Sequence, residues 1–465
     1  MHQPKHNLGL RLTKLLNIIL VTLPFAGCWF FYYAEKSVAA DYKIGNWLVV
    51  GLFVLLYVIF ARIYDAFLVS LTRISEMVYS QSLAMLVSDA IMFVVLWLLC
   101  GKFPYILPAL ATLACQFLLT VLWSYTAHKW YFRAFPPKRA AIIFDKHYAM
   151  DKLIPQYGLE KKFDIQKKLH VQDCIQDLSV LENTQVVFIG GVQSHERNVI
   201  LKYCIAKSIE VYVLPRIGDI IMGGAQKMHI LHLPILRVGR CVLPPEQMLL
   251  KRVFDILSSS IVLLVASPVM LMTAIAIKLT DGGPVFYKQN RLTLNGKVFK
   301  VLKFRSMRVD AEKDGVARLS TGDKDDRITP VGRVIRKLRI DELPQLFNIL
   351  GGSMSVVGPR PERPEIAEQY EKELPEFQLR LQVKAGLTGY AQVYGKYNTT
   401  PYDKLQMDLM YIANPSFWED IKIVFATIKI IFIPESTDGV AEGQTTAMTN
   451  DAPQEEEKEV VEIGK

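Results

Sequence analysis

The chain has 465 residues with a hydrophobic content of 51%, which is high for a water-soluble protein and points to a membrane. Lysine and arginine number 54 against 45 aspartate and glutamate, and the formal net charge of +9 suits anionic lipid head groups or phosphorylated substrates. Zinc-type and disulfide-type spacings are both missing, so we expect reduced thiols at all six cysteines: Cys28, Cys100, Cys115, Cys174, Cys204 and Cys241.

Four apolar segments lie within residues 1–135, at roughly 13–33, 46–63, 82–100 and 105–125. Each approaches the ~20 residues that a helix needs to span a bilayer. Nine lysine and arginine residues flank these segments on one side of the membrane and three on the other. The positive-inside rule therefore predicts a four-helix transmembrane region with both of its ends in the cytoplasm.

Residues 136–245 alternate short apolar runs with helical stretches. We expect buried strands at 140–144, 185–191, 210–215 and 233–238, in the alternation that is typical of a Rossmann-like α/β domain. Gly190-Gly191 follows one of these strands, but the sequence contains neither a Gly-x-Gly-x-x-Gly nor a Walker pattern there. We therefore assign no cofactor to this domain.

The apolar run from Ile256 to Leu279 is about 24 residues long, enough to cross the membrane once more. A crossing would leave the basic segment that follows on the outer side, against the positive-inside rule. Pro268 lacks the N–H of a helix interior and bends a helix, and the Ser267 hydroxyl can bond the carbonyl that is left free. We therefore expect a re-entrant helix over about 254–280, kinked at Ser267-Pro268, with both ends at the cytoplasmic surface.

An acidic pair, Asp341-Glu342, lies between two predicted helices in the stretch 329–361. Thr329 is typical of a helix start, and Pro344 restarts the helix after the pair. At the mouth of the second helix, free backbone N–H groups, the helix dipole and nearby arginines should keep both carboxylates ionised. The pair then serves as nucleophile or metal ligand, or it merely caps the helix and pairs with an arginine. The residues alone leave both readings open.

Residues 284–340 carry 15 lysine and arginine residues against 6 aspartate and glutamate residues. A solvated basic face or contact with anionic lipids would explain the excess, but its place beside the acidic pair favours binding of a diphosphate and a lipid phosphate. Nucleic acid is not expected as a partner, because the segment follows no nucleic-acid motif and adjoins the membrane helix. Arg360 stands between two prolines, which fix the backbone and aim the side chain.

Several spaced motifs within residues 246–434 resemble the bacterial sugar transferase family, the polyprenyl-phosphate hexose-1-phosphate transferases. They are KRVFD at 251–255, Ser267-Pro268 in its apolar run, KFRSM at 303–307, the run from DDRIT at 325 to NIL at 350, SMSVVGPRP at 353–361 and AGLTGYAQV at 385–393. Their shared order over most of this range makes the resemblance specific, whereas DELPQ alone would not.

The resemblance implies a membrane enzyme of the phosphotransferase class in three parts. A transmembrane region at 1–135 precedes a Rossmann-like cytoplasmic domain at 136–245 with a structural or regulatory role. A mostly α-helical catalytic domain at 246–434 contains the re-entrant helix. The acidic tail at 435–465 is expected to be disordered.

The implied reaction transfers hexose 1-phosphate from a UDP-hexose, either UDP-glucose or UDP-galactose, to undecaprenyl phosphate and releases UMP. It would be the first membrane step of capsule or exopolysaccharide biosynthesis. The implied location is the bacterial cytoplasmic membrane, with the catalytic domain and both termini on the cytoplasmic side. The sequence leaves open whether the protein is a homodimer.

The resemblance also implies roles for single residues. Asp341 would attack the sugar-proximal phosphorus to give a covalent phosphosugar intermediate, and Glu342 would hold Mg²⁺. The family commonly has a small hydroxyl residue just before the acidic pair, where this chain has Leu338-Arg339-Ile340, so Arg339 is either a further phosphate contact or a pairing partner. Four cations would grip the phosphates: Lys303, Arg305, Arg336 and Arg360.

Two alternatives stay open at this point. A membrane glycosyltransferase would use the same donor but release UDP. A non-catalytic membrane scaffold or regulator would keep its function when Asp341 is changed.

Overall fold

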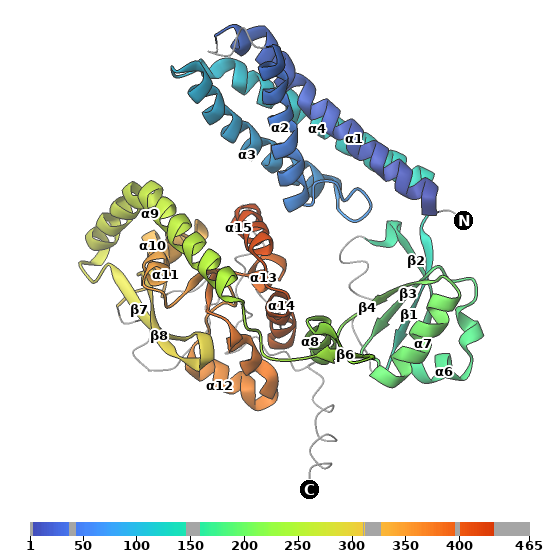
Figure 1. Ribbon diagram of the computed structural model, residues 1–465. Helices are drawn as coiled ribbons and strands as arrows, with labels where there is room; N and C mark the ends of the chain where they lie inside the picture. Colours follow the sequence, from blue (N-terminus) through green and yellow to red (C-terminus); the bar gives the residue numbers. More distant parts are fainter. Residues whose placement is uncertain are drawn as a thin grey trace. The chain divides into compact units, whose positions relative to one another are not determined.

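The computed structural model describes residues 3–36, 43–145, 159–309, 311, 327–395 and 400–431. The chain divides into two compact units, residues 1–215 and 216–465 (Figure 1). The tail predicted at 435–465 lies outside the described residues.

The first unit begins with four long helices that are apolar and long enough to cross a membrane, as the sequence predicts. Tyr57 donates a hydrogen bond to Asn17 at 2.6 Å, and Asn17 donates one to Gln81 at 3.0 Å, so these three buried polar side chains link α1, α2 and α3. The helices are α1 (Gln3–Cys28), α2 (Lys43–Ile63), α3 (Ile74–Cys100) and α4 (Ile106–Ala134), and α1 continues through short π and 3-10 segments at Trp29–Tyr33 and Ala34–Lys36.

A parallel four-stranded sheet follows in the same unit, in the order β2-β1-β3-β4. Three of the expected strands are present. The edge strand β2 was not predicted, because Lys167 interrupts the apolar alternation of Phe163, Ile165 and Leu169. Its elements are β1 (Lys138–Phe144), β2 (Phe163–His170), α6 (Val171–Gln176), β3 (Val186–Gly190), α7 (Ser194–Ala206) and β4 (Glu210–Val213), with 3-10 turns at Leu159–Lys161 and Leu178–Leu181.

The expectation of a buried strand at 233–238 was wrong. This run forms β6 (Leu233–Arg237), which pairs antiparallel with β5 (Gln226–Ile230) in a two-stranded hairpin of the second unit. Leu233 and Leu236 are 64% and 48% exposed. Pro234 lies inside the strand, and proline cannot donate to a ladder on both sides, which confines it to an edge position.

The rest of the second unit is mostly helical, as the family resemblance implies for residues 246–434. β7 and β8 form an antiparallel hairpin, and β9 and β10 form a short parallel pair. The elements are α8 (Ile217–Gly223), α9 (Pro245–Asp281), β7 (Phe286–Leu292), β8 (Val298–Phe304), α10 (Pro330–Lys337), α11 (Gln345–Leu350), β9 (Ser355–Val357), α12 (Pro364–Glu373), η8 (Pro375–Gln382), β10 (Gly386–Thr388), α13 (Tyr390–Tyr394), α14 (Pro401–Ala413) and α15 (Phe417–Ile431), with 3-10 turns η5 (Leu294–Gly296) and η7 (Ile340–Glu342).

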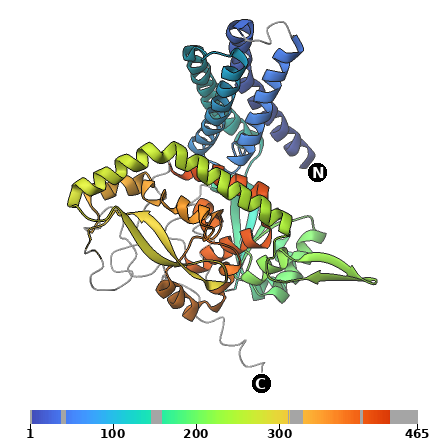
Figure 2. The ribbon, with the colours of Figure 1, turned by 60° about the vertical axis from the view of Figure 1, so that its left-hand side comes forward.

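The helix α9 is continuous through Ser267-Pro268, where a kink was expected. Pro268 has no N–H to give to the carbonyl four residues earlier, and the Ser267 hydroxyl donates to that carbonyl, Leu264 O, at 2.8 Å. The ribbon of α9 is bent in Figure 2. Apolar side chains cover its surface, with Leu264 78% and Leu279 81% exposed. α9 is also long and apolar enough to cross a membrane.

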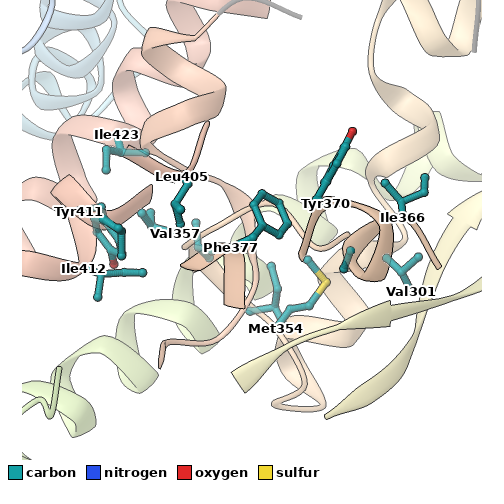
Figure 3. Packing of buried hydrophobic residues seen from close by; sticks show 14 of the residues in the cluster. Val301, Met354, Val357, Ile366, Tyr370, Phe377, Leu405, Tyr411, Ile412 and Ile423 are labelled. Carbon is teal, nitrogen blue, oxygen red and sulfur yellow. The ribbon is translucent and has the colours of Figure 1, made fainter. Parts of the chain in front are cut away.

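One hydrophobic cluster supports β9, α11, α12 and α14 (Figure 3). Met354 and Leu405 are fully buried in it. Tyr370 on α12 meets Phe377 on η8 edge to face, with ring centroids 5.1 Å apart. Aromatic pairs of this kind add to the stabilisation from buried area. The segments that connect β9, α11, α12 and α14 are therefore supported by a packed hydrophobic core.

Glycines allow the backbones around β9 and β10 to touch. Gly358 N donates to Thr388 O at 2.9 Å, and Gly386 N donates to Pro359 O at 2.9 Å. A Cβ at Gly389 would overlap the Gly358 carbonyl, and one at Gly386 would overlap backbone atoms of Gly358. Only residues without a side chain fit where two backbones approach so closely.

Candidate active site

The acidic pair lies on a single turn between two helices. Thr329 caps α10, and its hydroxyl accepts a hydrogen bond from Gly332 N at 2.9 Å. Arg339 has a φ of 54°, a left-handed conformation that leads the chain into η7, and α11 starts after Pro344. The order of helix, pair and helix is as predicted. The left-handed Arg339 is not visible in the sequence, because non-glycine residues seldom adopt this conformation.

Three segments of the chain meet at Glu342. Lys303, near the end of β8, places its Nζ 3.0 Å from Glu342 Oε1. Arg360, in the loop after β9, places its Nη2 3.0 Å from the same oxygen. The Glu342 side chain is 15% exposed and that of Arg360 is 45% exposed, so the guanidinium also faces solvent. The structure therefore brings Lys303 and Arg360 to the acidic pair.

The electrostatics of the cluster keep Glu342 ionised. Burial raises the pKa of Glu342, but the charges of Lys303, Arg360 and Arg339 together outweigh burial and hold the pKa well below its usual range. Burial lowers the pKa of Lys303, and Glu342 only partly opposes that effect. Glu342 is thus a fixed anion that holds two cations in place.

Asp341 differs from the expectation that both carboxylates are fully ionised. Burial, followed by the charge of Glu342, raises the pKa of Asp341 to about 6, against the opposing charges of Lys303, Arg336 and Arg360. Neighbouring carboxylates with pKa values pushed apart are a common arrangement for two different roles in one reaction. Asp341 is the more basic member, which suits it to attack an electrophile.

The other two predicted phosphate-binding cations lie in different surroundings. Arg336 is in the last turn of α10 and acts on Asp341 through its charge. Arg305 is 7% exposed, and its guanidinium packs so closely on Gly283, in the turn after α9, that a Cβ there would overlap it. Its contacts tie β8 to the end of α9, and its role at a phosphate stays a prediction.

The KRVFD segment joins α9 to the site. Lys251 Nζ lies 2.6 Å from Asp420 Oδ2 on α15. Arg252 donates to the carbonyls of Ile349 and Leu350 at the end of α11, at 2.6 and 2.8 Å. These contacts satisfy carbonyls that a helix end leaves free.

Asp255, one turn further along α9, fastens the helix to β9. One of its carboxylate oxygens accepts hydrogen bonds from Ser355 Oγ at 3.0 Å and from Val356 N at 2.9 Å. Asp255 is 3% exposed. The N-terminal turns of α9 are therefore bonded to the strand that precedes Arg360.

Sequence reasoning missed a buried group of charges behind Arg360. Two of its members, Arg380 and Asp408, stand between apolar neighbours in η8 and α14, and a charge on an otherwise apolar helix face is the signal that could have revealed these two. Arg380 and Asp408, for example, have side chains that are 4% and 1% exposed. The group consists of Arg291, Glu362, Arg380 and Asp408.

The carboxylates of Asp341 and Glu342 fit a metal ion whose other ligands come from the phosphates of a bound substrate. Among the described residues, no group of three or more His, Cys, Asp and Glu side chains could hold a metal alone. Mg²⁺ is usually bound by one or two carboxylates together with substrate phosphates. Glu342 Oε1 is engaged by Lys303 and Arg360, so Mg²⁺ would use Asp341 or the second oxygen of Glu342.

The fold and site together define a membrane-helix protein with two differently tuned carboxylates in a cationic cluster, an arrangement suited to phosphoryl chemistry. Residues 246–434 match the family model described as bacterial sugar transferase. The chain belongs to this family.

Several known proteins are similar to part of this chain. A UDP-N-acetylgalactosamine-undecaprenyl-phosphate N-acetylgalactosaminephosphotransferase of Aeromonas hydrophila is 41% identical over 234 residues, 50% of this chain and 54% of that protein. A UDP-glucose:undecaprenyl-phosphate glucose-1-phosphate transferase of Klebsiella pneumoniae is 43% identical over 194 residues, 41% of this chain and 41% of that protein. The protein of the same name from Caulobacter vibrioides is 40% identical over 183 residues, 38% of this chain and 68% of that protein. The match thus spans about half the length of the Aeromonas and Klebsiella proteins.

Proposed function

We propose that this protein transfers hexose 1-phosphate from a UDP-sugar to undecaprenyl phosphate and releases UMP. The observation that carries the proposal is the acidic pair, in which Asp341 is more basic and Glu342 is a fixed anion bound to Lys303 and Arg360. The pair lies in the region that matches the family, and the names of the relatives supply the classes of donor and acceptor. The step would begin capsule or exopolysaccharide assembly at the bacterial cytoplasmic membrane.

The proposed first half-reaction forms a covalent intermediate. A carboxylate oxygen of Asp341 attacks the phosphorus next to the sugar, and the bond from that phosphorus to the bridging oxygen of the diphosphate breaks. UMP leaves with the bridging oxygen, and the sugar phosphate stays on Asp341 as an acyl phosphate. Splitting a difficult transfer into two easier ones is the usual gain from a covalent nucleophile.

In the second half-reaction, a phosphate oxygen of undecaprenyl phosphate attacks the same phosphorus. The acyl-phosphate bond breaks, Asp341 regains its carboxylate, and the product is a sugar diphospho-lipid. Arg360 and Lys303 neutralise negative charge on the transferred phosphate, since phosphoryl transfer depends mainly on positioning and charge stabilisation. Mg²⁺ held with the phosphates by the acidic pair would neutralise further charge on the diphosphate.

We also propose that α9 is re-entrant. Support comes from the Ser267 bond to Leu264 O, which satisfies the carbonyl freed by Pro268, and from the apolar surface of the helix. A helix that returns to the same surface leaves the basic β7–β8 hairpin in the cytoplasm, as the positive-inside rule requires. Because Asp255 fastens α9 to β9, the site would then lie at the height of the lipid phosphates.

Topology is tested with single cysteines in a variant whose six native cysteines are replaced by serine. Glu246→Cys and Lys297→Cys lie before and after the apolar part of α9, and both residues are exposed. In inverted and right-side-out vesicles, a re-entrant helix predicts that a membrane-impermeant maleimide labels both from the cytoplasmic side. Labelling of the two positions from opposite sides would show a crossing.

The reaction is tested by nucleotide release from purified protein in nanodiscs with undecaprenyl phosphate and Mg²⁺. The donors are UDP-glucose, UDP-galactose and UDP-N-acetylgalactosamine, because the relatives named above differ in the sugar. Asp341→Asn is expected to lower UMP release by at least ~10³-fold, as expected for loss of a nucleophile. The matched control is Glu368→Gln, an exposed carboxylate on α12.

UMP from one donor, lost in Asp341→Asn and retained in Glu368→Gln, supports the proposal. Radioactive sugar that stays on the protein without acceptor, and parallel lines in initial-rate plots, would support the covalent step. UDP as product would favour a glycosyltransferase. No nucleotide from any donor, with an active family member in the same assay, would favour a scaffold.

A further inference from the structure

The loop that brings Arg360 to Glu342, residues 359–362, is held at each of its carbonyls. Backbone N–H groups from β10 and from the end of β7 donate to the first and last of them, at 2.9 and 3.0 Å. Two arginine side chains hold the two between: Arg380 Nη2 donates to Arg360 O at 3.0 Å, and Arg291 Nη1 donates to Pro361 O at 2.9 Å. The backbone under Arg360 is therefore fixed by side chains from distant segments.

Arg380 is itself held by two carboxylates and an aromatic ring. Its Nε and Nη2 lie 2.9 and 2.6 Å from Asp408 Oδ2 on α14, and its Nη1 lies 3.7 Å from Glu362 Oε1. Its guanidinium also stacks on the ring of Phe377, 4.8 Å from the centroid. A planar fork with several donors can bind a carboxylate and a carbonyl together, which a lysine ammonium cannot reproduce in the same geometry.

We propose that Arg380, oriented by Asp408, is a positioning residue that fixes the peptide carbonyl of Arg360 and thereby keeps the Arg360 guanidinium at Glu342 and at the transferred phosphate. The inference rests on the proposed function. The side chains of Arg380 and Asp408 are buried, 4% and 1% exposed, and Arg380 reaches the site through the carbonyl of Arg360 that it holds.

A catalytic arginine must be accessible to the substrate and must also be held in a fixed position, and an exposed arginine on its own meets only the first requirement. The Arg360 side chain is 45% exposed and can reach a substrate, but a long exposed side chain on an unsupported loop would sample many positions. A shift of about 1 Å in a catalytic group can cost ~10²-fold in rate. Anchoring the carbonyl of the same residue removes the backbone part of that freedom and leaves the charged head available to the substrate.

The test uses the full-length protein in nanodiscs and measures kcat, KM and the midpoint of thermal unfolding. Arg380→Lys keeps the charge beside Asp408 and removes the fork. It is expected to lower kcat by ~10-fold or more and to change KM for the UDP-sugar by less than about threefold, because the displaced Arg360 acts on the transition state. The matched control is Lys372→Gln, which removes the cation of an exposed ion pair with Glu368 on α12.

A second variant covers the case in which Arg380→Lys does not fold. Replacing both partners, Arg380→Met with Asp408→Leu, removes the clamp and the Asp408 charge together and leaves Glu362 paired with Arg291. Exchanges of a buried ion pair for apolar residues often preserve stability. The same loss of kcat is expected from this double variant.

A double-mutant cycle with Arg360→Ala distinguishes positioning from a general structural effect. If Arg380 acts through Arg360, then Arg380→Lys has less than about a twofold further effect on kcat once Arg360 is alanine, because coupled residues are not additive. Multiplication of the two separate losses would overturn the inference, as would an unchanged kcat in Arg380→Lys. A wild-type protein that releases no UMP overturns the proposed function and this inference with it, whereas an active wild type with an additive cycle overturns the inference alone.

Discussion

The bond between Asp255 and β9 gives a quantitative prediction, because one buried carboxylate oxygen satisfies two buried donors. Asp255→Ala removes the acceptor of Ser355 Oγ and of Val356 N, and these residues are 1% and 8% exposed. A buried donor left without a partner costs about 1–3 kcal/mol, so the variant is expected to lose about 2–6 kcal/mol of folding free energy. For a unit of this size, 1 kcal/mol shifts the midpoint of thermal unfolding by about 2–4 °C.

The assay is thermal unfolding in detergent, followed by intrinsic fluorescence. Asp255→Ala should lower the midpoint by at least ~4 °C, whereas Asp255→Asn, which keeps an oxygen for both donors, should lower it by less. Ser258→Ala is the matched control, since Ser258 on the same helix bonds only the helix carbonyls of Phe254 and Asp255. A midpoint for Asp255→Ala within ~1 °C of the wild type would refute the reasoning, because it would mean that these buried bonds contribute nothing.

Three further predictions concern the reaction. Asp341 must be ionised to attack, and its pKa is raised to about 6. The value of kcat/KM for UMP release should therefore be constant above that pH and fall about tenfold per pH unit below it. A fall that begins only near the usual pKa of aspartate would contradict this prediction. Lys303→Met removes a charge that lowers the pKa of Asp341, so the acid limb of the same profile should move to higher pH, while Lys300→Met, an exposed cation on the same strand, should leave it unchanged. EDTA should abolish UMP release and added Mg²⁺ should restore it, with an unchanged unfolding midpoint, because the described residues contain no metal cage that could support the fold.

Patterns that depend on local sequence were predicted well. The four N-terminal helices and the order of helix, acidic pair and helix follow from apolar runs and from capping residues such as Thr329. Ser267 also bonds the carbonyl freed by Pro268, as the chemistry of a proline in a helix requires. Each of these features is decided by residues within a few positions of one another.

Features that depend on distant contacts were not predicted. The raised pKa of Asp341 comes first from burial, which no pattern of charges along the chain displays. Arg380 meets Asp408 and the carbonyl of Arg360 only after three segments have packed together. The run 233–238 was predicted as a buried strand of the Rossmann-like domain, because a short apolar run does not reveal the strand with which it pairs.

The contact between backbones around β9 and β10 has a consequence for exchanging parts between related proteins. The segments 353–361 and 385–393 are separate in the sequence, but Gly358, Gly386 and Gly389 press them together with no space for a side chain. A chimera that takes one segment from a relative therefore needs a partner of matching shape. The two segments must therefore be exchanged together. A chimera in which only one of them is replaced would displace the loop that carries Arg360.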